Sequence, residues 1–171
     1  MKRTTFATAG IAALAFATLA APAPAEAQYR QKITNDAAKC AAGAGPAVRV
    51  TITDIKESKG TIRVQSYRGT KEDWLEKGKW IYRMEAPAKA GSMSFCMPLP
   101  RPGTYAIAVR HDINGNGSTD IFADGGAMSN NPSINIFNLG KPSYKKTAFE
   151  VGPGVESISI RMRYRLSLIH I

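Results

Sequence analysis

Short stretches in which apolar and polar residues alternate recur along the chain, and they constrain its fold more than any other feature. They are clearest at residues 48–53 (VRVTIT), 104–110 (TYAIAVR) and 158–164 (ISIRMRY). A period of two places successive side chains on opposite faces of a strand, so that one face can be buried. Helical periodicity is almost absent. The pattern therefore predicts an all-β domain.

Weaker strand signals lie between these stretches, at residues 62–67, 79–85, 92–97 and 148–151. Strands 48–53 and 62–67 flank a short charged turn, and we expect them to form a hairpin. The segment Thr70–Gly78 breaks the alternation and predicts a single helical turn.

About seven short strands with turn signals between them indicate a β-sandwich of immunoglobulin-like or transthyretin-like type. We expect at most one short helix in it. Residues 112–143 are rich in Gly and Asn and predict one long loop. Loops of this length in compact domains are usually functional or organised by something else.

Residues 1–27 have the features of a signal peptide. A basic start at Lys2 and Arg3 precedes an apolar run, and Ala25–Ala27 is a small-x-small cleavage site. A transmembrane anchor is the alternative, but the run is short, rich in Ala and followed by prolines. We therefore expect a mature chain that begins at Gln28, has no transmembrane segment, and is periplasmic or secreted.

The mature chain divides into an N-terminal arm (residues 28–46) and a β-sandwich domain (residues 47–165). The last six residues, 166–171 (LSLIHI), resemble the translation of a transposon-end sequencing adapter. We interpret them as an artefact rather than a natural apolar tail, so His170 is given no functional role.

The chain is basic, with a formal net charge of +10 that becomes about +9 once Lys2, Arg3 and Glu26 are removed. Such a charge favours anionic envelope components as partners. The basic residues are scattered, with no run of five or six. This favours a solvated basic surface and argues against a nucleic-acid partner.

Cys40 and Cys96 are the two cysteines of the chain. In an exported protein a disulfide between them is the natural expectation. A metal or redox role is the alternative, but neither cysteine lies in a C-x-x-C pattern and neither has an adjacent His. The disulfide would tie the N-terminal arm to a core strand.

Residues 112–120 (DINGNGSTD) place oxygen-bearing side chains at alternate positions of a glycine-rich turn. A D-x-[DN]-x-[DN]-G run begins a calcium loop, because a hard cation binds six to eight oxygens. The twelfth position of such a loop is Ala123 here, so we expect the next residue to supply the closing carboxylate. The predicted ligands are Asp112, Asn114, Asn116, Ser118 through its carbonyl, Asp120 and Asp124.

Calcium binding at such a loop would be weak, with a Kd of about 10⁻⁴–10⁻³ M. A loop held by its two Asn-Gly turns alone, without an ion, is the alternative.

Other polar residues near the loop are candidates for a weaker role in binding. His111 precedes the calcium-type run, but a zinc or catalytic site needs a second His or a Cys nearby. We therefore expect His111 to be packed or hydrogen-bonded at a strand end. Ser129, Asn130 and Asn131 either cap the loop or line a ligand groove beside Asp112. No nucleophile elbow, nucleotide loop or zinc signature is present, so we do not expect an enzyme.

Several segments together resemble a bacterial family, the domain of unknown function 2141. They are RVTITDIKESKGTIRVQSY, LPRPGTYAIAVRHDINGNGSTD, MSNNP, KPSYKKTAFEV and SISIRMRYR, in order from about Cys40 to Arg165. The resemblance implies a small exported β-sandwich protein. It implies no activity, because none is established for the family.

Three hypotheses follow from the sequence. The first is a non-enzymatic binding or accessory module with a calcium-ordered loop that presents a surface to an anionic envelope glycan or a protein. The second is a purely structural envelope domain without a metal. The third and most remote is an envelope hydrolase that uses Asp112 and Asp120.

Overall fold

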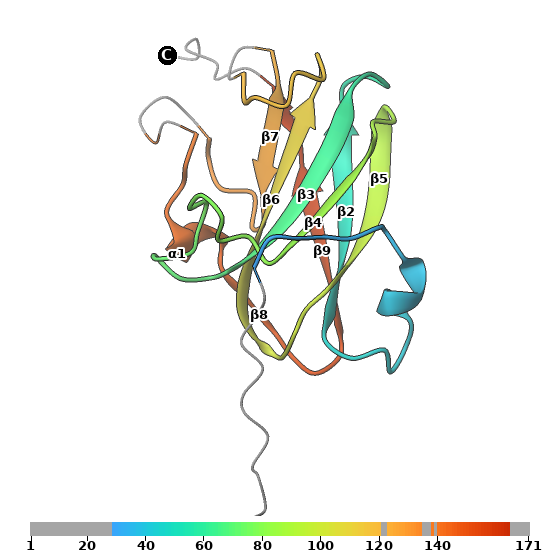
Figure 1. Cartoon of the computed structure of the whole chain (residues 1–171), viewed down its shortest axis with the longest axis vertical. Coiled ribbons are helices and arrows are strands. Elements are labelled where there is room, and N and C mark those ends of the chain that lie inside the picture. The colour runs from blue at the N-terminus through green and yellow to red at the C-terminus, as the bar shows by residue number, and fades with distance from the viewer. Residues whose placement is uncertain (1–28, 121–122, 135–137, 139, 165–171) are drawn as a thin grey trace, which may run out of the picture.

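The computed structural model describes residues 29–120, 123–134, 138 and 140–164. Two β-sheets pack face to face in this part of the chain (Figure 1). The expected signal peptide (residues 1–27) and the expected artefact (residues 166–171) lie outside the described residues. Among the described residues, no helix is long and apolar enough to cross a membrane.

The larger sheet is mainly antiparallel and is centred on β6 (Gly103–Asp112). Among its described strands, only the short outer strand β1 (Gln31–Lys32) pairs in parallel, with β4 (Tyr82–Pro87). The strand order of this sheet is β1, β4, β3 (Thr61–Arg68), β6, β7 (Gly125–Met128) and β10 (Arg163–Tyr164), and β8 (Phe149–Val151) also pairs with β6.

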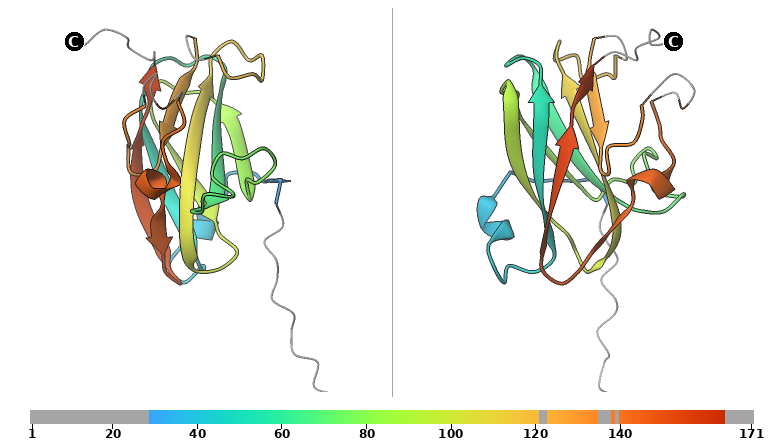
Figure 2. Two further views of the ribbon diagram at one scale, coloured as in Figure 1. Left: turned by 90° about the vertical axis from the view of Figure 1, so that its left-hand side faces the viewer. Right: turned by 180° about the vertical axis from the view of Figure 1, so that it is seen from behind.

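The smaller sheet has β2 (Ala47–Ile55) at its centre. β2 pairs antiparallel with β5 (Gly91–Pro98) and in parallel with β9 (Val155–Arg161), as the right-hand view of Figure 2 shows. The prediction of an all-β sandwich is thus confirmed. The described part of the chain also contains one short α-helix, α1 (Tyr144–Thr147).

The predicted hairpin between the first two long strands is wrong, because β2 and β3 lie in different sheets. The turn between them instead packs on the end of β6. Gly60 in that turn has φ +71°, and a Cβ added to it would lie 1.9 Å from the backbone oxygen of Asp112. Only glycine permits this approach, which directs β3 across to the larger sheet.

Two further segments differ from the prediction. Residues 112–143 are not one long loop, because strand β7 lies within them and pairs with β6. The stretch 158–164 is not one strand: β9 ends in the smaller sheet and β10 pairs with β7 in the larger one. Met162 lies buried at the switch, and its N–H donates to the Thr53 carbonyl at 3.0 Å. Thr70–Gly78, in contrast, contains the predicted single helical turn, with a hydrogen bond from Trp74 N to Thr70 O at 3.1 Å.

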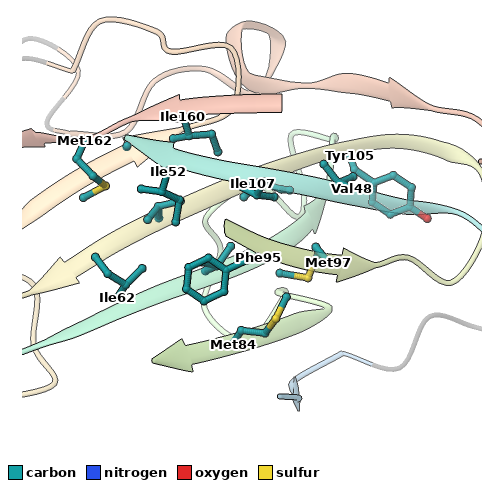
Figure 3. Close-up of a cluster of buried hydrophobic side chains, with 14 of the residues drawn as sticks. Val48, Ile52, Ile62, Met84, Phe95, Met97, Tyr105, Ile107, Ile160 and Met162 are labelled. Carbon is teal, nitrogen blue, oxygen red and sulfur yellow. The ribbon is translucent and has the colours of Figure 1, made fainter. Parts of the chain in front are cut away.

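The main core fills the space between the sheets. Its largest fully buried apolar side chains come from both sheets, and Figure 3 shows most of them in one layer. Each such side chain stabilises the fold by roughly 1.5–3 kcal/mol relative to exposure. These fully buried apolar side chains are Phe95, Ile52, Ile62, Ile81, Met84, Met97, Ile107, Ile160, Val48, Val50 and Val64.

A second apolar cluster covers part of the outer face of the larger sheet. It contains Tyr67, Trp74, Trp80, Ala106 and Met128. The rings of Tyr67 and Trp74 meet edge to face, 5.4 Å apart. The Trp74 indole N–H donates to the Pro142 carbonyl at 2.8 Å, so two distant loops close over this face together.

The N-terminal arm lies along the edge of β5. The Asn35 side chain donates to the Ser94 carbonyl at 3.0 Å and accepts the Cys96 N–H at 2.9 Å, much as a neighbouring strand would. A 3₁₀-helix, η1 (Ala37–Cys40), follows, and the predicted Cys40–Cys96 disulfide is confirmed. The arm thereby protects an exposed strand edge.

Replacing both Cys40 and Cys96 with Ser should lower the free energy of unfolding. The disulfide joins residues 56 apart in sequence, for which the chain-entropy model gives roughly 4 kcal/mol. Urea denaturation of the oxidised protein and the double variant measures the difference. Equal midpoints for the two proteins would show that the bridge does not stabilise the fold.

Candidate functional site

The end of β6 delivers a buried carboxylate into the loop. Asp112 is only 4% exposed, and its Oδ2 accepts hydrogen bonds from Gly117 N at 2.9 Å and from Arg110 Nη2 at 3.2 Å. Its Oδ1 is buried and has no hydrogen-bond partner within the described part of the chain. Buried polar atoms are nearly always paired, so this oxygen is an exception that calls for an explanation.

The next two polar side chains form consecutive turns. Asn114 Oδ1 accepts the Asn116 N–H at 3.0 Å, and Asn116 Oδ1 accepts the Ser118 N–H at 2.8 Å. These are Asx turns, in which a side-chain oxygen bonds the backbone two residues later. Gly115 and Gly117 between them have φ of +70° and +76°. Asn114, Asn116 and Ser118 are all exposed.

A second buried carboxylate closes the loop. Asp124 is 6% exposed, and its two oxygens accept the N–H groups of Ile113 at 3.2 Å and Asp120 at 3.0 Å. Asp120 in turn accepts the Ala123 N–H at 3.2 Å. The carboxylates of Asp112 and Asp124 therefore point inward, toward the backbone of the loop, and are not spread into solvent.

Arg110 is a part of this site that the sequence analysis missed. Besides Asp112, its guanidinium donates to the Gly117 carbonyl at 2.9 Å and to Thr119 Oγ1 at 3.0 Å. Burial lowers the pKa of Arg110, nearby Arg63 lowers it further, and Asp112 and Asp124 oppose the shift. A fixed positive charge thus lies within the loop. In the sequence, Arg110 lies on the polar side of an alternating strand, where a solvated surface arginine is the ordinary expectation.

The structure therefore brings only some of the predicted calcium ligands close together. Asp112 and Asp124 are buried at the two ends of the loop, whereas the asparagines lie on its exposed side. Within the residues that the structure describes, no three His, Cys, Asp or Glu side chains form a group able to hold a metal. An ion here would have to draw on asparagine and backbone oxygens as well as carboxylates.

His111 faces the core and joins three elements beneath the loop. It is fully buried, its Nε2 lies 2.6 Å from the Lys59 carbonyl, and its Nδ1 lies 2.8 Å from the Tyr164 hydroxyl. Because a carbonyl only accepts, Nε2 must carry a proton. The Tyr164 hydroxyl also accepts the Lys56 N–H at 3.0 Å. The turn before β3, the end of β6 and β10 are thereby held together.

Gly125 allows the Tyr164 ring to take this position. A Cβ at Gly125 would lie 2.4 Å from the edge of the ring, too close for any other residue without movement of that ring. The two residues are paired in register between β7 and β10.

Ser129, Asn130 and Asn131 lie at the far end of β7 and hold the chain to its neighbours. Ser129 is fully buried between the Ile107 N–H and the Thr147 carbonyl, at 3.0 and 2.6 Å. The side-chain amides of Asn130 and Asn131 donate to the backbone carbonyls of Ala148 and Ser159. The backbone N–H of Ser129 donates to the Ile107 carbonyl, five residues before Asp112 on β6. The structure therefore does not place them beside Asp112.

Comparison with known protein families gives a match. The model of a family described as an uncharacterised protein conserved in bacteria, DUF2141, matches residues 50–159, which is more than half of the chain. The chain belongs to this family. No curated protein and no solved structure matches.

Replacing Tyr164 with Phe should destabilise the protein by roughly 1–3 kcal/mol, because Lys56 N and His111 Nδ1 would each lose a partner. Burial raises the pKa of the Tyr164 phenol. The contribution of the Tyr164 hydroxyl to the free energy of unfolding should therefore be complete below the ordinary tyrosine pKa of about 10. It should be lost as the pH rises through the higher pKa of Tyr164 in the folded protein. Chemical denaturation across this pH range tests both points. An unchanged stability at neutral pH would show that the hydroxyl is not structural.

Proposed function

We propose that this member of the family is an exported, non-enzymatic binding or accessory module whose loop 112–124 binds one calcium ion. The periplasm or the extracellular space, where calcium is available, would be its compartment. The observation that carries the proposal is the Oδ1 atom of Asp112, buried and without a hydrogen-bond partner among the described residues.

A buried carboxylate oxygen without a partner destabilises a folded protein by roughly 1–3 kcal/mol or more. A cation bound to Asp112 Oδ1 would remove this cost. Asn114 and Asn116 each use their amide oxygen in one hydrogen bond, and such an oxygen has a second lone pair. Two buried carboxylates and two amide oxygens make a sparse site, in keeping with a Kd of about 10⁻⁴–10⁻³ M.

The second candidate is a structural envelope domain without a metal, and the contacts of Arg110 favour it. The guanidinium already bonds Asp112 Oδ2 and the Gly117 carbonyl, as a cation in the loop would. It also repels any second cation nearby. The two candidates therefore differ in whether Arg110 replaces the ion or acts beside it.

Calorimetric titration of the purified protein with calcium, after chelator treatment, should give a measurable heat. At a calcium concentration ten times Kd, the unfolding free energy should rise by about 1.4 kcal/mol, which is detectable as a thermal shift. Asp112→Asn should abolish both signals.

Two further variants complete this test. Asp54→Asn is the control, since Asp54 is exposed and pairs with Arg161 on the smaller sheet, and it should bind calcium as the unmodified protein does. Arg110→Gln should bind calcium more tightly, because a competing charge is removed. The absence of heat and thermal shift at millimolar calcium in both the unmodified protein and Arg110→Gln would contradict the calcium proposal and support the structural candidate.

A further inference from the structure

A row of charged residues crosses the outer face of the larger sheet. The strand register places Arg63 opposite Glu85 on one side and Arg110 on the other. Gly126 lies opposite both Arg110 and Arg163. The row therefore runs Glu85, Arg63, Arg110, Gly126, Arg163 over five neighbouring strands. Its five residues come from five strands that are separated in sequence.

Gly126 leaves a gap in this row between two arginines. A Cβ built on Gly126 meets no atom within 4 Å, so the space above it is open. Arg110 and Arg163 flank the gap, with backbones about 10 Å apart, two strand spacings. Arginine side chains from backbones at this separation are long enough to reach one carboxylate or phosphate group between them, which can accept hydrogen bonds from both.

The arginines of the row differ in whether they have an ion-pair partner. Arg63 pairs with Glu85 at 2.6 Å and Arg110 with Asp112 at 3.2 Å. Arg163 makes no ion pair within the described residues, and its Nη2 reaches only the Asn131 carbonyl at 3.4 Å.

Arg83, on β4, is likewise without an ion-pair partner there, and it stacks on Trp80 at 4.2 Å. The pKa of Arg83 is lowered by its burial and by Arg63. The arginines of this face are therefore close enough to repel one another.

A cavity of about 650 Å³ adjoins the row, a size typical of small-molecule sites. Arg63, Arg110 and Arg163 line its polar end. Apolar side chains from the second cluster and its surroundings line much of the rest, together with Tyr67 and the polar Gln65. The apolar side chains are Leu75, Ala108, Met128 and Ile134. A ligand that fits this lining has a charged group at one end and an apolar body.

Two acidic residues, Asp120 and Asp124, also line the polar end. Both oxygens of Asp124 accept backbone N–H groups of the loop, and Asp120 accepts the Ala123 N–H. The negative charge of these two residues disfavours an anion on the loop side of the row. The same charge favours an anion bound above Gly126, on the side of Arg163.

We propose that this cavity binds an amphipathic anion, a molecule with one carboxylate or phosphate group and an aliphatic chain. The anionic group lies above Gly126 between Arg110 and Arg163, and the chain lies against Leu75, Met128 and Ile134. This proposal does not rest on the calcium proposal, although Arg110 belongs to both sites. The titration is made on chelator-treated protein, so its outcome does not depend on calcium at the loop.

The test is calorimetric titration of the purified protein with dodecanoate below its micelle concentration. We expect saturable one-to-one binding. Arg163→Gln should weaken it roughly tenfold or more, the usual effect of losing a hydrogen bond to a charged group. Gly126→Val should also weaken it, because the added side chain fills the gap while every arginine remains.

Matched controls separate this site from general electrostatic or apolar binding. Arg161→Gln removes the same charge from the smaller sheet, where Arg161 is exposed and pairs with Asp54, and it should bind dodecanoate normally. Dodecyl maltoside has the chain without the charge and should not bind. Dodecyl phosphate distinguishes a phosphate headgroup from a carboxylate, and binding of either supports the proposal.

Several outcomes would overturn it. One is an equal loss of dodecanoate affinity in Arg161→Gln and Arg163→Gln, and another is dodecyl maltoside that binds as tightly as dodecanoate. A third is normal dodecanoate binding by Gly126→Val. The last is a protein that binds a polyuronate glycan but neither dodecanoate nor dodecyl phosphate. A thermal melt of each variant shows whether it is folded. If Arg163→Gln is not, Gly126→Val decides alone, since a Cβ at this position meets no atom within 4 Å.

Discussion

Strand β6 separates a core side from a site side, and the elements around it take their places accordingly. Its inward residues, Tyr105, Ile107 and Val109, belong to the main core. Its outward residues end in Arg110, and the strand then delivers Asp112 to the loop. β3 pairs along one edge of β6, and β7 and β8 along the other. The alternation that buries the core therefore also places Arg110 on the opposite face, beside the loop carboxylates.

The loop that follows is ordered by charge and by hydrogen bonds to its own backbone. Long connections without regular structure are uncommon in compact domains unless something organises them. Here Asp112 and Asp124 accept backbone N–H groups at the two ends of the loop, and Arg110 donates to its middle. The same guanidinium belongs to the cationic row on the sheet. The loop and the cavity are therefore neighbours that share Arg110. In our proposals the loop binds a cation and the cavity binds an anion.

The sequence allowed prediction of what depends on local pattern. Alternation at 104–110 predicted β6, and the two cysteines predicted the bridge to β5. Alternation says which face of a strand is buried, but not which strand lies beside it. That is why the predicted hairpin of β2 and β3 is wrong, and why the alternation at 158–164 predicts one strand although the chain changes sheets at Met162.

The candidate site was predictable to the same extent. The D-x-N-x-N-G run indicated the loop and its carboxylates from a local pattern. The row of Arg63, Arg110 and Arg163 depends on the register of strands far apart in sequence. No local signal distinguishes these arginines from the other scattered basic residues. The position of Gly126 between two of them becomes meaningful only once the pairing of β7 with both β6 and β10 is known.

The central claim is that inward-facing carboxylates at the end of β6 hold the loop in place. Native-state hydrogen exchange of the calcium-free protein tests it most directly, at the amide of Gly117, which donates to Asp112. We expect this amide to exchange far more slowly than in an unstructured peptide, and to lose that protection in Asp112→Ala. Exchange at the unstructured rate in the unmodified protein would contradict the claim.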